Sequence, residues 1–150
     1  MTKNRALLAM LLAALVAAGF GWRWERRFGG GFEPGLLQTG YRSVAVLARD
    51  YELSGIRPGD RVDVLVVFDA TTRERPVKYA ATILQNAMVL GTTRTGKLDD
   101  KGVAYLMLNP IEAQFAALAP RQGELSLILR KPGDREIHPL ELSDFRSLFR

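Results

Sequence analysis

The chain has 150 residues, of which 47% are hydrophobic and 25% are charged, a composition typical of a folded protein with room for one modest domain. It contains no cysteine, which excludes disulfides, thiolate metal ligands and cysteine nucleophiles. The net charge of +5 suits an anionic membrane surface, an acidic partner or nucleic acid. No cluster of basic residues interleaved with stacking aromatics is present, so nucleic acid is not the expected partner.

Residues 1–22 have the pattern of a membrane anchor or a secretion signal. An uncharged run from Ala6 to Trp22 follows two basic residues. The run is at the short end of the roughly 17–25 residues that cross a bilayer as a helix, and it is longer than the roughly 7–15 residues of a cleavable apolar region. We therefore predict an N-terminal transmembrane helix that stays attached to the chain. A cleaved signal is the alternative.

Residues 23–40 follow this segment and are rich in glycine and turn-forming residues, with three consecutive glycines in FGGGFEPG. Such a composition predicts a flexible glycine-rich linker between the anchor and the body.

Residues 41–135 are expected to form the body, a mainly β domain. Apolar and polar residues alternate there in short runs, which is the period of half-buried strands. The predicted strands, in chain order, are Tyr41–Arg49, Arg61–Phe68, Val77–Gly91, Val103–Asn109 and Glu124–Arg130. The third run is long enough for one bent strand, or for two strands separated by a bulge near Gln85 and Asn86. Two polar segments are predicted as a loop, Ala70–Val77, and as a hairpin tip, Thr93–Gly102.

One short helix is predicted in NPIEAQFAALAPRQG, residues 109–123. Asn109 is a good N-cap, a proline suits the first helical position, and Glu112 stands where a capping box needs an acid. Three apolar residues recur at helical spacing and give the helix one apolar face, namely Ile111, Phe115 and Leu118. The fold class predicted is thus mainly β, as a β-clip-like fold or a small barrel or sandwich, with one short α-helix.

The last residues, 136–150, are predicted to be a C-terminal tail in which Ser143 and Asp144 start a short helix. The single histidine, His138, stands in this tail before a proline. A lone histidine is a poor start for a catalytic triad or a zinc site, both of which need converging partners.

The carboxylates Asp60 and Asp63 are the obvious candidates for acid–base chemistry, and the pattern does not support that role. Residues three apart in a strand point to opposite faces, so the two side chains cannot share a substrate. After Pro58 and Gly59, the Asp60 side chain is expected to accept backbone N–H bonds and close a turn. No phosphate-binding glycine loop, nucleophile elbow or calcium loop is present. We expect no enzyme activity, no cofactor and no metal.

Three ordered segments, SGIRPGDRVDVLVVF, ATILQNAMVLG and VAYLMLNPIEAQFAALAPRQGELSLILR, resemble the C-terminal domain of Flp/Tad pilus assembly proteins of the CpaB/RcpC type. Those proteins share a G-x-(V/I)-x-P-G-D-x-V-D-V entry, an L-x-Q-N-x-x-V-L segment, and a T-P-E-Q-A helix before a G-x-L-x-L-x-L-R strand. The resemblance covers roughly Tyr41 to Arg130. The motif residues taken as a candidate interaction or structural site are Gly55, Arg57, Pro58, Gly59, Asp60, Asp63, Gln85 and Asn86.

The resemblance implies a non-enzymatic component of a pilus or secretion machine that docks onto other assembly subunits, such as the secretin. The sequence does not set the oligomeric state, so an oligomer stays open. It also implies a single-pass protein of the bacterial inner membrane with its body in the periplasm. This orientation rests on the resemblance, because basic residues flank both ends of the apolar run. A periplasmic β-clip chaperone, or a module that binds a peptide or glycan, is the alternative.

Two departures from the family pattern qualify this expectation. Only Trp24 to Gly40 lies where relatives carry a SAF domain, so that domain is predicted to be absent, and any role it has in relatives does not transfer to this chain. The helix also begins N-P-I-E-A in place of T-P-E-Q-A, which moves the acid by one position.

Overall fold

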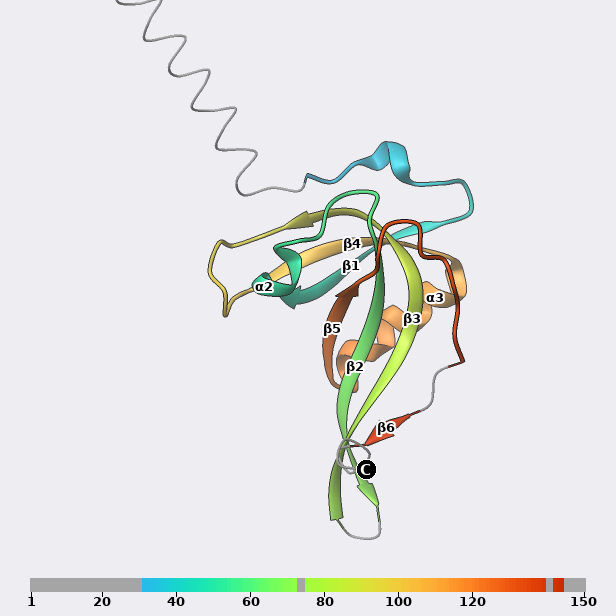
Figure 1. Cartoon of the computed structure of the whole chain (residues 1–150). Coiled ribbons are helices and arrows are strands. Elements are labelled where there is room, and N and C mark those ends of the chain that lie inside the picture. The colour runs from blue at the N-terminus through green and yellow to red at the C-terminus, as the bar shows by residue number, and fades with distance from the viewer. Residues whose placement is uncertain (1–30, 73–74, 140–141, 145–150) are drawn as a thin grey trace, which may run out of the picture.

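The computed structural model describes residues 31–72, 75–139 and 142–144 (Figure 1). The predicted anchor, residues 1–22, and the first part of the predicted linker lie outside these ranges. Within them, no helix has the length and apolar character needed to cross a bilayer.

The body is built on one antiparallel sheet. Its strands are β1 (Arg42–Arg49), β2 (Arg61–Thr72), β3 (Arg75–Thr93), β4 (Lys101–Leu108) and β5 (Glu124–Leu129). They lie in the order β1-β4-β3-β2-β5, and a two-residue strand, β6 (Ser143–Asp144), pairs with β3. The mainly β prediction is confirmed. The sheet is not closed, since β1 and β5 are its two edges, so the expectation of a small barrel is not met.

A single-turn helix that the sequence analysis did not predict, α2 (Asp50–Leu53), lies between the two edges. Its Glu52 accepts a hydrogen bond from the backbone N–H of Leu127 in β5 at 3.2 Å. Arg49 at the end of β1 forms an ion pair with Glu124 of β5, with 2.8 Å between nitrogen and oxygen. Side chains, in place of a backbone ladder, therefore connect the two edges of the sheet.

Alternation along the strands produces the core, as predicted. Val62 and Val64 have no exposed surface, whereas Arg61 and Asp63, which alternate with them, are half-buried on the other face. The core includes side chains from all five strands and the two helices, among them Val46, Val66, Leu84, Val89, Leu106, Leu108, Leu125, Leu127, Leu53 and Ala116.

The predicted helix is α3 (Pro110–Leu118), and its capping box is confirmed. The Asn109 side chain accepts the N–H groups of Ile111 and Glu112, both at 2.9 Å, and the Glu112 carboxylate accepts the Asn109 N–H at 2.8 Å.

The apolar face of α3 points away from the sheet. The helix instead packs on the core through small side chains: Ala116 is buried, and so is its C-cap residue Ala119, which begins the 3₁₀ turn Ala119–Arg121. Ile111, Phe115 and Leu118 are 65%, 53% and 59% exposed. An apolar helix stripe ordinarily faces the core. Here the alanines occupy that side of the helix, and the larger side chains face water.

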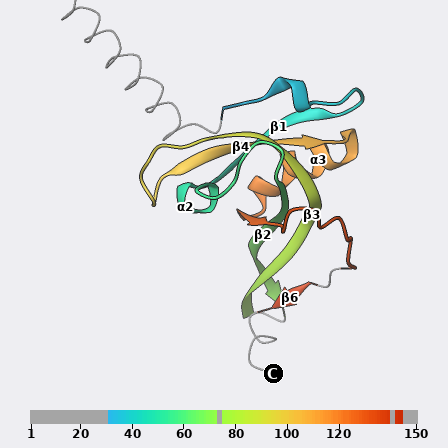
Figure 2. The same ribbon diagram turned by 45° about the horizontal axis from the view of Figure 1, so that its top comes forward.

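The predicted polar loop at Ala70–Val77 is wrong, because β2 continues to Thr72 and β3 resumes at Arg75. The two strands form a long hairpin that extends away from the rest of the sheet (Figures 1 and 2). Cross-strand pairs stabilise it: Phe68 stacks on Tyr79 at 5.9 Å between ring centroids, and Lys78 donates to Asp69 at 2.8 Å. These pairs stand directly before the segment predicted as a loop, and the ladder continues through it with Ala70 opposite Val77 and Thr71 opposite Pro76.

Two further predictions concern β3 and the tail. Val77–Gly91 forms part of one continuous strand, and its register shifts near Gln85 and Asn86, so the bulge is confirmed within a single strand.

The helix predicted at Ser143 and Asp144 is wrong, because these residues form β6 and pair with Ala80 and Tyr79.

Residues 31–33, at the start of the described part of the predicted linker, contact the sheet, and the chain then runs on to β1 (Figure 2). The Glu33 N–H donates to the Leu90 carbonyl at 2.8 Å, and the Phe32 ring meets Tyr105 edge-on at 5.2 Å. A 3₁₀ turn follows at Pro34–Leu36. Gly91 permits this approach, since a Cβ there would lie 2.6 Å from both the Gly31 carbonyl oxygen and the Phe32 Cα.

We predict that Gly91→Ala lowers the free energy of unfolding by about 1–3 kcal/mol, because the added methyl group must displace residues 31–33 from β3. Urea unfolding of the full chain measures the change. Gly55→Ala is the matched control: nothing lies within 4 Å of its Cβ position, and the change should stay within about 0.5 kcal/mol. Equal stability of the Gly91→Ala and wild-type chains would contradict the close contact.

Candidate functional site

Pro58, Gly59 and Asp60 form the turn that the sequence predicts. Gly59 has φ +89°, the left-handed conformation that a type II turn needs after its proline. The Asp60 carboxylate accepts the Arg57 N–H at 2.8 Å, and the Asp60 N–H donates to the Arg57 carbonyl at 3.1 Å. The carboxylate of Asp60 therefore closes the turn.

Backbone hydrogen bonds attach this turn to β3. The Gly59 N–H donates to the Val89 carbonyl at 2.8 Å, and the Val89 N–H donates to the Asp60 carbonyl at 2.9 Å. The Arg57 side chain and Gly55 are exposed beside the turn. The central part of the motif thus joins the loop to the sheet through its backbone.

Asp63 belongs to a cluster centred on Arg130, whose side chain is only 6% exposed. One Asp63 oxygen accepts the Asn86 N–H at 2.8 Å and the Arg130 Nη1 at 2.9 Å. The other guanidinium nitrogen, Nη2, donates to Asp134 at 2.8 Å and to the Glu136 carbonyl at 2.5 Å. We call these five residues the Arg130 cluster. It joins β2, β3 and the segment that follows β5.

The bulge in β3 is fixed by this cluster. Val62 pairs with Ala87 and Val64 with Leu84, so two residues, Gln85 and Asn86, lie opposite Asp63. Asn86 has φ +60°, an uncommon conformation for a residue other than glycine. Its N–H is bound by Asp63 and its carbonyl accepts Arg61 Nη1 at 2.8 Å, so charged side chains of β2 hold both sides of the residue.

The charges of the cluster reinforce one another. Hydrogen bonds from Arg130 and from the Glu136 N–H lower the pKa of Asp134 below its ordinary value. Hydrogen bonds to Asp134 and Asp63 raise the pKa of Arg130. Both residues are therefore charged at neutral pH, and the attraction between them stabilises the fold.

Gln85 connects the bulge to the C-terminal tail. Its amide nitrogen donates to the His138 carbonyl at 2.7 Å, and its amide oxygen accepts the His138 N–H at 3.1 Å. The side chain thus pairs with a backbone residue in the way a neighbouring strand would.

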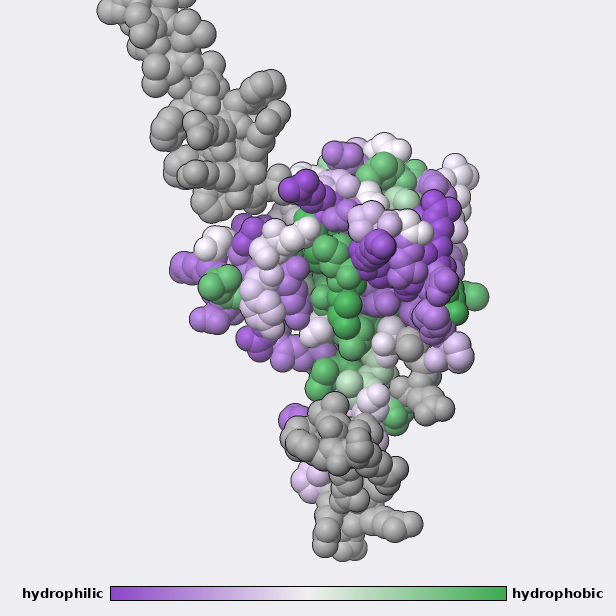
Figure 3. Space-filling model, viewed as in Figure 1, coloured by the Kyte–Doolittle hydropathy of each residue, from purple (hydrophilic) through white to green (hydrophobic). Residues whose placement is uncertain are grey.

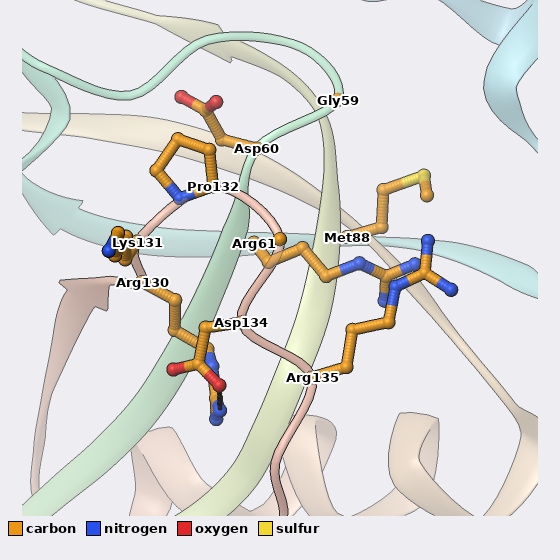
Figure 4. A pocket seen from close by; sticks show the side chains of 10 residues that line it. Gly59, Asp60, Arg61, Met88, Arg130, Lys131, Pro132, Asp134 and Arg135 are labelled. Carbon is orange, nitrogen blue, oxygen red and sulfur yellow. Dashed lines mark hydrogen bonds and ion pairs between the residues drawn. The ribbon is translucent and has the colours of Figure 1, made fainter.

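A pocket of about 210 Å³ lies between the turn and the loop after β5. Gly59, Asp60, Arg61 and Met88 line one side, and residues 130–135 line the other (Figure 4). Small-molecule sites are usually larger, at about 300–1,000 Å³, and mostly apolar. In the described part of the chain, no three His, Cys, Asp or Glu side chains come together in a way that could hold a metal ion. The charged groups here bind one another and stabilise the segment after β5.

The structure thus brings together Asp63, Gln85 and Asn86, which come from two separate motifs. It attaches Pro58, Gly59 and Asp60 to the same strand, and it leaves Gly55 and the Arg57 side chain outside. Sequence reasoning did not single out Arg130 or Asp134 as site residues. The signal that could have found Arg130 is its place as the last residue of the G-x-L-x-L-x-L-R segment, a charge directly after a strand.

Asp50 is a second buried charge that the sequence analysis missed. It has no exposed surface, and its carboxylate accepts the N–H groups of Thr95 and Gly96 at 3.0 and 3.2 Å. Arg94 lies 3.4 Å from it. Asp50 therefore holds the hairpin tip between β3 and β4.

We predict that Asn86→Ala destabilises the chain by about 1–2 kcal/mol, because the Cβ of alanine clashes with the backbone carbonyl in the left-handed conformation and alanine has no polar side chain to offset this. Asn86→Gly should cost less, since glycine adopts this conformation readily and retains both backbone hydrogen bonds. Urea unfolding of the two variants measures the difference. Equal losses, or a larger loss for glycine, would contradict the role of the bulge.

The lowered pKa of Asp134 predicts a pH dependence. Its contribution to stability is fully present above the unfolded pKa, at about pH 4, and is lost as the pH falls through the lower folded pKa. Wild type should therefore be more stable than Asp134→Asn at neutral pH, and the difference should shrink on acidification below about pH 4. Thermal melts across pH measure this. The control, Asp99→Asn at the hairpin tip, should leave the midpoint unchanged, and a gap for Asp134→Asn that is constant with pH would contradict the prediction.

Comparison with known protein families finds the same family that the sequence motifs resemble. The model of the family described as Flp pilus assembly protein RcpC/CpaB matches residues 35–130, more than half of the chain. No curated protein and no solved structure gives a significant match. The matched range contains the turn, the bulge and Arg130, and with them all of the interactions between β2, β3 and the end of β5. The chain belongs to the RcpC/CpaB family of Flp pilus assembly proteins.

Proposed function

We propose that this protein is a non-enzymatic component of the Flp pilus assembly machine, anchored in the bacterial inner membrane by residues 1–22. Its body lies in the periplasm and docks onto other subunits, the secretin among them. Family membership supports the role in pilus assembly. The apolar run near the N-terminus supports the anchor.

The observation that carries the docking role is the outward apolar face of α3. Ile111, Phe115 and Leu118 each expose more than half of their surface on a helix of nine residues. The capping box and the buried alanines hold this helix in place, so the apolar side chains are presented on a rigid support. A contiguous apolar surface of this kind marks a site of protein–protein contact, and a helix face commonly docks into a groove.

A second apolar area lies over β2 and β5. Figure 3 shows hydrophobic side chains running down the middle of the viewed face, between hydrophilic regions. Val67 and Ile128, which the register of β2 and β5 places on the same face, are 37% and 49% exposed. Because β5 is also an edge of the sheet, this area adds to the surface available to other subunits.

We predict that the triple variant Ile111→Gln, Phe115→Gln and Leu118→Gln folds normally but co-purifies with other pilus subunits at least about tenfold less than wild type. The substituted side chains are exposed, so the free energy of unfolding should change by less than about 1 kcal/mol. The measurement is affinity purification from solubilised membranes, followed by quantification of the secretin and the remaining subunits.

The matched control is the pair Gln114→Ala and Ala117→Gln, two exposed positions of the same helix that lie outside the apolar face. This variant should associate as wild type does. If the triple variant recovers as much of the partner subunits as wild type, the docking role of α3 is contradicted. Recovery of the wild-type chain in the soluble fraction, with a new N-terminus, would sink the uncleaved anchor.

A further inference from the structure

The outer edge of β3 is open along much of its length. β4 pairs with β3 only from Met88 to Thr93. Before Met88, the described strands that pair with β3 are β2 on one side and the two-residue β6 on the other. Unpaired strand edges invite pairing with another chain, and natural proteins usually cover them.

Described residues of the C-terminal tail contact this edge at its two ends. Tyr79 pairs with Asp144, Ala80 pairs with Ser143, and the Gln85 side chain pairs with the backbone of His138. The residue numbers of each pair have the same sum, as a single antiparallel register requires. At Tyr79 and Ala80 this edge is therefore already used for strand pairing, and at Gln85 for side-chain hydrogen bonds, by residues of the same chain.

The first residues of the tail, up to Glu136, are bound by the charged side chain of Arg130, and the described residues beyond Glu136 have fewer contacts. Arg130 binds Asp134 and the Glu136 carbonyl. Beyond Glu136, the apolar side chains of Ile137 and Leu142 remain 63% and 56% exposed. The pairing of the described tail residues thus buries little apolar surface, which is the usual source of tight strand binding.

We propose that the β3 edge from Tyr79 to Gln85 is a strand-addition site, to whose two ends the tail binds in the free protein and which an extended segment of another pilus assembly subunit fills in the assembled machine. This inference rests on the proposed function and names the site that one partner uses. Strand addition takes its affinity from backbone hydrogen bonds and its specificity from alternate side chains.

The partner strand should carry apolar residues at alternate positions. Ala81 and Ile83 on the edge are half-buried and packed against the core, so apolar side chains beside them extend that core. A tethered tail competes with an effective concentration on the order of millimolar. An identical tail from a second copy gains nothing over it, whereas a partner that buries its apolar side chains better than Ile137 and Leu142 can displace it.

A disulfide lock tests the proposal directly, because the chain contains no cysteine. Ala80 and Ser143 are register partners, and the Cα separation of such partners is within disulfide reach. The oxidised variant carrying Ala80→Cys and Ser143→Cys should recover at least about tenfold less of one partner subunit than wild type in the co-purification. Reduction before mixing should restore recovery, and each single variant should behave as wild type.

A chain ending at Glu136 provides the opposite test, since it keeps the Arg130 contacts and removes the distal tail. It should bind the partner at least as well as wild type. Loss of binding by this folded, shortened chain would overturn the proposal, because the tail itself would then be the binding segment. A disulfide that joins the introduced cysteines of two different copies would also overturn it, in favour of tail exchange.

The two proposals fail differently. If the wild-type chain recovers no pilus subunit, the docking function fails and the strand-addition site fails with it. If wild type and the oxidised variant recover every subunit equally, only the strand-addition site fails. The α3 variant and the lock address separate surfaces, so each can fail while the other holds.

Discussion

The ion pair between the buried Arg130 and the half-buried Asp63 connects the three parts of the body that define its shape. Arg130 follows β5, Asp63 lies in β2, and the same carboxylate binds the N–H of Asn86 in β3. A planar guanidinium with five donors can bind several acceptors at once, which lysine cannot do. Removing Arg130 would take from Asp63 its ion-pair partner, and removing Asp63 would leave the buried guanidinium with Asp134 as its one remaining carboxylate in the cluster, so either change should destabilise the fold.

The bulge at Asn86, which this ion pair holds in place, determines the course of β3 and the position of its exposed edge. It bends β3, so that the strand pairs with β4 at one end and continues beside β2 into the long hairpin at the other. Gln85, the other residue of the bulge, then meets the tail at His138. The same interaction that stabilises the core thereby sets the position of the edge on which a partner strand is proposed to bind.

Sequence patterns correctly predicted the structural features that depend on residues close together in the sequence. They missed the features that depend on contacts between residues far apart in the sequence. The Asp60 turn and the Asn109 cap need only three or four residues, and both are as expected. The partner of Asp63 is Arg130, 67 residues away, and no local spacing indicates it. The sequence also did not indicate that the apolar face of α3 points outward, for another reason. Ala116 and Ala119 contribute little to an apolar pattern, yet they allow the helix to approach the sheet closely.

Native-state hydrogen exchange of the full chain tests the central claim, that a firmly held cluster carries a lightly held tail. The Asn86 amide, bound by Asp63, should be among the slowest to exchange and should open only with global unfolding. The His138 amide, bound by Gln85, should exchange at least about tenfold faster through local release of the tail. Equal protection of the two amides, or faster exchange at Asn86, would contradict the account.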